Sequence, residues 1–234
     1  MDMSFSSGYA IDIVMCIDAT GSMSRVINEI KRTALTFHDR LVEAIEEADR
    51  SVEKLRVKVI AFRDYARREA PAMEMSEFFT LPEDNKDFRD FVDGIEAIGG
   101  GDLPENSLEA LALALRSDWT TGGARRRHLI LLFTDAPALP LGERWAYPGY
   151  PEEEMPDDLS ELATWWESPE ESTLDSTYEP RSGRLFAFVP RSEPWTAMED
   201  WSRFFPIYSE NPAGPDELDM QEVIELIVQG AIHI

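Results

Sequence analysis

The chain has 234 residues, of which 43% are hydrophobic, so it is long enough to bury a sizeable core. Its 46 Asp and Glu residues outnumber its 22 Lys and Arg residues, and the resulting net charge of −24 disfavours binding to nucleic acid or to anionic membranes. The single cysteine, Cys16, excludes an internal disulfide, and neither a signal-peptide pattern nor a membrane-spanning stretch is evident. We therefore expect a cytoplasmic protein.

The first part of the chain alternates between strand and helix patterns. Residues 10–17 are nearly all apolar, as in a strand that is covered on both faces. One long helix is expected next, because apolar residues recur at steps of three and four: Ile27, Ile30, Ala34, Phe37, Leu41 and Ile45. Residues 55–62 predict a second strand, residues 78–81 a short edge strand, and residues 84–98 a helix.

The same alternation continues to the C-terminus. Pro104 is expected to open a helix after the glycine turn at 99–102, because proline favours the first helical turn. Further strands are predicted at 129–133, 184–189 and 206–208, and a final helix at 217–232. The pattern predicts a single α/β domain over residues 1–234, with a doubly wound, mostly parallel sheet of about six strands and helices on both faces.

Oxygen-bearing side chains gather where the predicted strands end. Asp18 ends the first strand, and Thr20 and Ser22 follow it at alternate positions. Asp135 follows a central strand, and Asp102 lies in a loop that enters a helix. The carboxyl ends of parallel strands meet at one edge of a sheet, where ligands bind, and hard divalent cations prefer oxygen ligands. We therefore predict a metal site at this edge. A helix N-cap would explain Ser22 alone, but not an aspartate that ends a buried strand.

Four segments together resemble the von Willebrand factor A (vWA) domain family. Residues 18–23 (DATGSM) are similar to the D-x-[ST]-G-S motif that opens the metal-ion-dependent adhesion site of the family, and Asp135 matches the aspartate that closes it. Residues 99–105 (GGGDLPE) and 62–65 (FRDY) resemble segments of intracellular members, such as the alpha-kinase-associated and tellurite-resistance-associated proteins. The resemblance covers residues 10–135 by motif and implies a Rossmann-like fold.

The resemblance also implies roles for the site residues. The hydroxyls of Thr20 and Ser22 would bind the metal directly, and Asp18 and Asp135 would bind it directly or through water. The expected ion is Mg²⁺, with Mn²⁺ or Ca²⁺ as alternatives. Asp102 stands where adhesive members usually have threonine. If it reaches the metal, the ion should bind more tightly without a partner and prefer an acidic partner less; alternatively, Asp102 caps the following helix.

Two neighbouring segments allow both functional and structural interpretations. Arg63 and Asp64 of the FRDY element could form a surface ion pair, but the family pattern favours a structural role beneath the site. Residues 136–183 form an insertion rich in proline, acidic and aromatic residues, with a short helix expected at 157–167. Because the insertion begins beside Asp135, we predict a lid or rim that helps to select the partner. The alternative is that its rings pack on the flank of the same domain.

The resemblance implies a non-enzymatic module that binds a protein partner through the metal site and the insertion. Intracellular relatives work beside an ATPase of the AAA class or beside kinases and phosphatases. An alternative is a magnesium-dependent phosphohydrolase of the haloacid-dehalogenase type, which also places an aspartate at the end of its first strand. That chemistry requires a second carboxylate where this chain has Thr20, and a cation that is hard to supply because no lysine follows Lys86. A third possibility is a structural domain whose site binds no ion.

Overall fold

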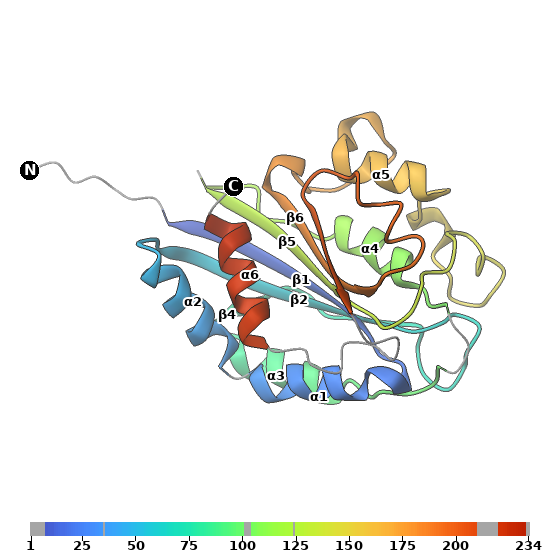
Figure 1. Cartoon of the computed structure of the whole chain (residues 1–234), viewed down its shortest axis with the longest axis horizontal. Coiled ribbons are helices and arrows are strands. Elements are labelled where there is room, and N and C mark those ends of the chain that lie inside the picture. The colour runs from blue at the N-terminus through green and yellow to red at the C-terminus, as the bar shows by residue number, and fades with distance from the viewer. Residues whose placement is uncertain (1–7, 35, 101–103, 124, 210–219, 233–234) are drawn as a thin grey trace, which may run out of the picture.

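One sheet of seven strands runs through the middle of the molecule (Figure 1). The computed structural model describes residues 8–34, 36–100, 104–123, 125–209 and 220–232. The strands are β1 (Tyr9–Asp18), β2 (Val52–Phe62), β3 (Met73–Met75), β4 (Phe79–Leu81), β5 (Arg126–Phe133), β6 (Gly183–Pro190) and β7 (Phe204–Ser209). Their order is β3-β2-β1-β5-β6-β7, and β4 also pairs with β2. All pairs are parallel except those of β3 and β4 with β2, which confirms the predicted doubly wound, mostly parallel sheet.

Helices cover both faces of this sheet (Figure 1). One face carries α1 (Ser24–Thr33), α2 (Phe37–Glu47), α3 (Asn85–Gly94) and α6 (Met220–Ile232). The other carries α4 (Ser107–Leu115) and α5 (Leu159–Glu167). Within the described ranges, no helix has the length and apolar character needed to cross a bilayer.

Side chains of β1 alternate between the two cores, as the pleat of a strand requires. Ile13 and Met15 pack with the helices of the first face, and Val14 and Cys16 with those of the second. The thiol of Cys16 is fully buried and donates to the carbonyl of Ala110 in α4. Strand β1 is therefore covered on both faces, as its apolar sequence predicts.

The expectation of one long helix over residues 27–45 is wrong, because α1 and α2 are separate. The apolar stripe is buried as predicted, but the chain turns between the two helices. Thr36 donates both its backbone N–H and its hydroxyl to the carbonyl of Thr33, at 3.0 and 3.3 Å. Threonine hydroxyls compete with helical backbone bonds in this way, which explains the interruption. Leu35 lies outside the described residues.

One further expectation differs from the structure, and one short strand was not expected. Pro104 does not open a helix, because α4 begins at Ser107 and Glu105 forms an isolated β-bridge with Ala138. Strand β3 has only three residues, which is too short to give a periodic signal in the sequence. The first residues of the predicted C-terminal helix, 217–219, lie outside the described residues.

The insertion divides into two parts with different surroundings. In the later part, Trp165 and Trp166 of α5 and Tyr178 are buried with α4 in the second core. In the early part, which we define as residues 136–158, Trp145 and Tyr147 are 61% and 39% exposed. The later rings therefore pack on the flank of the domain, whereas Trp145 and Tyr147 face solvent.

Candidate metal centre

Those predicted site residues that the structure describes, Asp18, Thr20, Ser22 and Asp135, lie at one edge of the sheet, where the parallel strands β1, β2 and β5 end. Strand β1 lies between the other two, and its register places Asp18 beside Phe62 and Ile17 beside Phe133. The residues that follow β2 and β5 therefore flank Asp18. We call this region the carboxyl edge.

Asp18 is fully buried and held by hydroxyl groups. Its Oδ1 accepts hydrogen bonds from the hydroxyl and the backbone N–H of Thr20, at 2.7 and 2.9 Å. Its Oδ2 accepts one from the hydroxyl of Thr134, at 2.7 Å. Burial raises the pKa of Asp18 to about 6, and the nearby charge of Asp135 adds to the rise, although these hydrogen bonds oppose it. The carboxyl edge thus holds an excess of negative charge.

Three further predicted donors, Thr20, Ser22 and Asp135, are described in the region of this carboxylate. Ser22 is exposed, and its hydroxyl is 3.3 Å from that of Thr20. The Oδ1 atom of Asp135 is buried and has no hydrogen-bond partner among the described residues. The structure thus brings Asp18, Thr20 and Ser22 together and places Asp135 within electrostatic range of Asp18. Asp102 lies outside the described residues.

The predicted glycine turn packs directly against the first motif. The backbone N–H of Gly21 donates to the carbonyl of Gly99 at 3.0 Å. Gly100 has a φ of +84°, and a Cβ at this position would lie 3.0 Å from the Cβ of Thr20. Only glycine combines this backbone conformation with such a close approach. The turn therefore fixes where Thr20 lies.

Replacing this glycine should destabilise the fold. Gly100→Ala is expected to lower the free energy of unfolding by roughly 1–3 kcal/mol, because it adds both backbone strain and a contact with Thr20. Equilibrium urea denaturation measures the change. Gly122→Ala is the matched control, since a Cβ there meets nothing within 4 Å. Equal stabilities of the two variants would contradict the proposed constraint.

Glu105 is a buried acidic residue of this region that the sequence reading did not single out. Its side chain is 2% exposed, and its Oε2 has no hydrogen-bond partner among the described residues. Burial raises the pKa of Glu105 to about 8, and the charges of Asp18, Asp64 and Asp135 add to the rise. Glu105 belongs to the GGGDLPE segment, whose resemblance to intracellular vWA members pointed to Asp102 and not to Glu105.

Arg63 binds the backbone beside the carboxyl edge, in the structural role that was predicted for it. It is 3% exposed, and its guanidinium donates to the carbonyls of Ala19 (3.1 Å), Pro71 (3.0 Å) and Glu96 (2.6 Å). It also pairs with the carboxylate of Glu74 at 2.6 Å. These bonds tie the residue after Asp18 to the loops on either side.

The alternative of an ion pair between Arg63 and Asp64 is wrong. Asp64 instead pairs with Arg144 of the insertion, through Nε at 2.7 Å and Nη2 at 3.1 Å. Although burial opposes it, the hydrogen bonds from Arg144 hold the pKa of Asp64 below its usual value. Tyr150 adds a second tie by donating to the buried Glu109 at 3.2 Å. The early part of the insertion is therefore fastened to the domain beside the carboxyl edge.

The chemistry of these donors fits a divalent cation. Among the described residues, no group of three or more His, Cys, Asp or Glu side chains is arranged to hold a metal ion. The candidate donors are of another kind, since the hydroxyls of Thr20 and Ser22 accompany the carboxylates of Asp18 and Asp135. All are oxygen ligands, which Mg²⁺ prefers. A cation would also offset the charge beside the unpartnered Oδ1 of Asp135.

Comparison with protein families agrees with this architecture. A family model described as the von Willebrand factor A domain matches residues 12–140, which is more than half of the chain. The chain belongs to the von Willebrand factor A domain family. The match covers β1, the carboxyl edge and the first residues of the insertion of this vWA domain. No curated protein sequence matches the chain.

Two solved structures with a similar fold are of bacterial pilus proteins. The D319A mutant of the PilB minor pilin from Streptococcus sanguinis is 8% identical, with a TM-score of 0.52, and the alignment covers 98% of this chain and 62% of that one. The pilus adhesin SpaC from Lactobacillus rhamnosus GG, in an open conformation, is 9% identical with a TM-score of 0.52, over 97% of this chain and 31% of that one. This vWA domain thus spans less than two thirds of either neighbour, and the likeness concerns the fold.

Proposed function

We propose that this vWA domain is a non-enzymatic module that binds a protein partner through a divalent metal at its carboxyl edge. The observation that carries the proposal is the Oδ1 atom of Asp135, which is buried, has no hydrogen-bond partner among the described residues, and lies near the fully buried carboxylate of Asp18. A buried acceptor without a partner is costly, so such atoms are uncommon unless a ligand satisfies them. A bound cation supplies that interaction.

The described residues have separate tasks in this proposal. Thr20, Ser22 and Asp135 would hold the ion, which is Mg²⁺ or alternatively Mn²⁺ or Ca²⁺. Asp18 would bind the ion directly or through water, and its Oδ1 accepts the hydrogen bond that orients the hydroxyl of Thr20. When bound, the ion offers a positive centre to an oxygen atom of the partner. Asp102 would add a third carboxylate.

The proposal also covers the kind of protein partner and the cellular location of this vWA domain. We propose a cytoplasmic module that works beside an AAA-type ATPase, a kinase or a phosphatase, with the insertion contributing to partner choice. The family resemblance to intracellular members supports this, as does the early part of the insertion, which lies beside the carboxyl edge. A phosphohydrolase is disfavoured, because Thr20 places a hydroxyl where that reaction requires a carboxylate.

Metal binding should raise thermal stability. A ligand at 100 times its Kd stabilises the native state by about 2.7 kcal/mol. For a chain of this size, that corresponds to a rise in Tm of roughly 5–10 °C. Melting scans with EDTA and with millimolar Mg²⁺, Mn²⁺ or Ca²⁺ measure the shift, which Asp135→Asn should remove. Asp87→Asn, an exposed aspartate on α3, should keep it.

The outcomes of this experiment separate the possibilities. A domain that melts at the same temperature with all three ions and with EDTA would exclude the metal site and leave a structural role. The same variants then test partner binding, since a protein captured from the lysate of the source organism should be lost with EDTA and with Asp135→Asn. A partner retained under both conditions would show that binding does not use the metal.

A further inference from the structure

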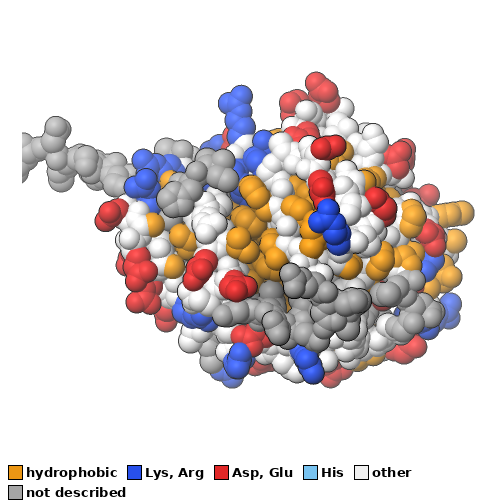
Figure 2. Space-filling model, viewed as in Figure 1, with side chains coloured by type: hydrophobic (Ala, Val, Ile, Leu, Met, Phe, Trp, Pro, Cys, Tyr) orange, Lys and Arg blue, Asp and Glu red, His pale blue; other side chains and the backbone are white. Residues whose placement is uncertain are grey.

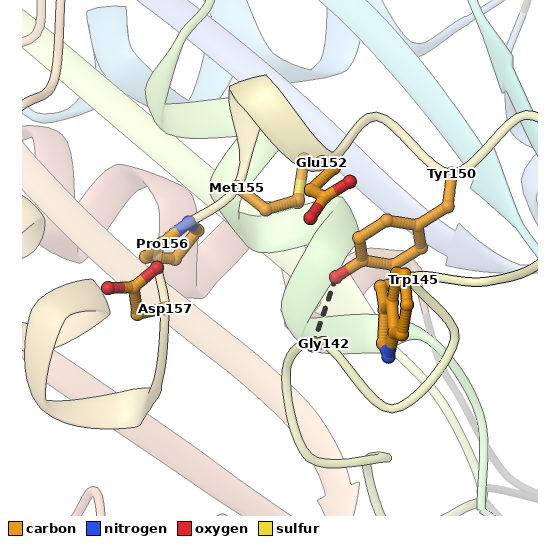
Figure 3. Close-up of a pocket in the computed structure, with 7 residues that line it drawn as sticks. All are labelled: Gly142, Trp145, Tyr150, Glu152, Met155, Pro156 and Asp157. Atoms are coloured by element: carbon orange, nitrogen blue, oxygen red, sulfur yellow. Dashed lines mark hydrogen bonds between the residues drawn. The ribbon is translucent and has the colours of Figure 1, made fainter.

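A pocket in the early part of the insertion combines aromatic rings with carboxylates. It measures about 310 Å³ and is lined by Gly142, Trp145, Tyr150, Glu152, Met155, Pro156 and Asp157 (Figure 3). In Figure 3, the rings of Trp145 and Tyr150 lie on one side and Pro156 and Asp157 on the other, with Glu152 between them in this view. We call it the acidic aromatic pocket.

The tryptophan of the acidic aromatic pocket lies at the surface. Trp145 is 61% exposed, whereas Trp165 and Trp166 of the same insertion are 1% and 0% exposed. Large rings at the surface are typical anchors of protein interfaces. Figure 2 shows hydrophobic and acidic side chains side by side at the right-hand end of the visible face, where the early part of the insertion lies in Figure 1.

No described residue neutralises the carboxylates of the pocket. Glu152 and Asp157 are exposed, and neither side chain has a hydrogen-bond or ion-pair partner among the described residues. The neighbouring Arg144 forms its ion pairs with Asp64 and Glu143 and not with these two carboxylates. The pocket thus presents unpaired negative charge next to the electron-rich faces of two aromatic rings.

The wall of the pocket is fixed to the rest of the domain. The hydroxyl of Tyr150 accepts a hydrogen bond from the backbone N–H of Gly142 at 3.0 Å and donates to Glu109. Its ring packs edge-on against Tyr65, with centroids 5.1 Å apart. Tyr65 follows Asp64 at the carboxyl edge, so the pocket and the candidate metal centre lie on connected segments. A preformed wall reduces the ordering that binding would require.

We propose that the acidic aromatic pocket binds an arginine side chain of the protein partner. A guanidinium stacks on aromatic rings and pairs with carboxylates, which matches both features of the pocket. Its volume lies at the small end of ligand pockets and suits one long side chain. This inference rests on the proposed protein-binding function but does not require the metal.

A short peptide tests the chemistry directly. The probe is acetyl-Gly-Ala-Arg-Ala-Gly-amide, and its control has citrulline, a neutral group of the same shape, in place of arginine. Titration into the ¹⁵N-labelled full chain, followed by NMR, should shift the indole N–H signal of Trp145 with the arginine peptide. The citrulline peptide should bind at least tenfold more weakly. Equal binding of the two peptides would overturn the proposal.

Substitutions in the pocket test whether the arginine peptide binds there. The pair Glu152→Gln and Asp157→Asn should weaken arginine-peptide binding at least tenfold, and the folded spectrum should persist because these side chains are exposed. Trp145→Ala should have the same effect, followed through the backbone amide signals because its indole is absent. The pair Glu46→Gln and Glu47→Gln, exposed on α2, removes the same charge elsewhere and should leave affinity unchanged. Equal losses in both pairs would mean that general attraction to an acidic protein, and not this pocket, binds the peptide.

The metal proposal is judged separately. Each titration is run with EDTA and with Mg²⁺, and the Tm shift of each variant with Mg²⁺ is recorded. A peptide that fails to bind while the Mg²⁺ shift persists would overturn the arginine pocket alone. Binding of the peptide without any Mg²⁺ shift would support the pocket and overturn only the metal site.

Discussion

In the absence of metal, the domain is expected to lose roughly 2–5 kcal/mol of its free energy of unfolding between pH 5 and pH 9, and Glu105→Gln should remove the largest single share of that loss. Burial, together with the charges of Asp18, Asp64 and Asp135, raises the pKa of Glu105 to about 8. Because the folded-state pKa lies above the unfolded value, the contribution of Glu105 is fully present below about pH 4.5 and disappears as the pH rises through about 8.

Urea denaturation in EDTA at pH 5, 7 and 9 measures this dependence. A smaller slope should remain in Glu105→Gln, because burial also raises the pKa of Asp18 to about 6 and that of Glu109 to about 7. Glu83→Gln, an exposed position, should behave like the unmodified chain. If Glu105→Gln and the unmodified chain lose stability in parallel, Glu105 is not the group that titrates. Mg²⁺ should flatten the curve if it binds this region.

The second large effect concerns Arg63. Arg63→Met should lower the free energy of unfolding by roughly 2–5 kcal/mol, because it breaks a partly buried ion pair and leaves several carbonyl groups without donors. The lost partners include the carbonyl of Ala19, next to Asp18, so any stabilisation by Mg²⁺ should shrink as well. Equilibrium urea denaturation provides the first measurement, and melting scans with Mg²⁺ provide the second.

Two comparison variants show whether geometry or charge matters at this position. Arg63→Lys keeps the charge but lacks the planar fork that reaches three carbonyls, so it should recover only part of the stability. Arg89→Met removes an exposed arginine paired with Asp93 on α3 and should cost less than about 1 kcal/mol. A loss of similar size in Arg63→Met and Arg89→Met would show that the buried network contributes little.

Much of the fold could be predicted from the sequence because its signals are local. Strand β1 and the helices around it follow from runs and stripes of apolar residues, which reflect burial on two faces or on one. The break between α1 and α2 could not be predicted in this way, since Thr33 and Thr36 interrupt the backbone without interrupting the stripe. Helix α4 begins at Ser107 and not at Pro104 because Glu105 forms a bridge with Ala138, and these two residues are 33 positions apart in the sequence.

The same distinction applies to the candidate site. Asp18, Thr20 and Ser22 are close in sequence, and the topology of a parallel sheet is enough to place Asp135 near them. The partner of Asp64 could not be inferred, because Arg144 lies 80 residues away in an irregular insertion. The burial of Glu105 was not predicted, because it depends on how that insertion packs and has no local pattern in the sequence.

The buried position of Cys16 has a practical consequence. It is the only cysteine in the chain, and burial raises the pKa of its thiol, so thiol-reactive dyes have no accessible native target on the folded protein. A cysteine introduced at an exposed position, such as Pro148→Cys, would carry a fluorophore at a single defined point. Movements of the loop around it could then be followed by fluorescence in a chain that is otherwise unchanged.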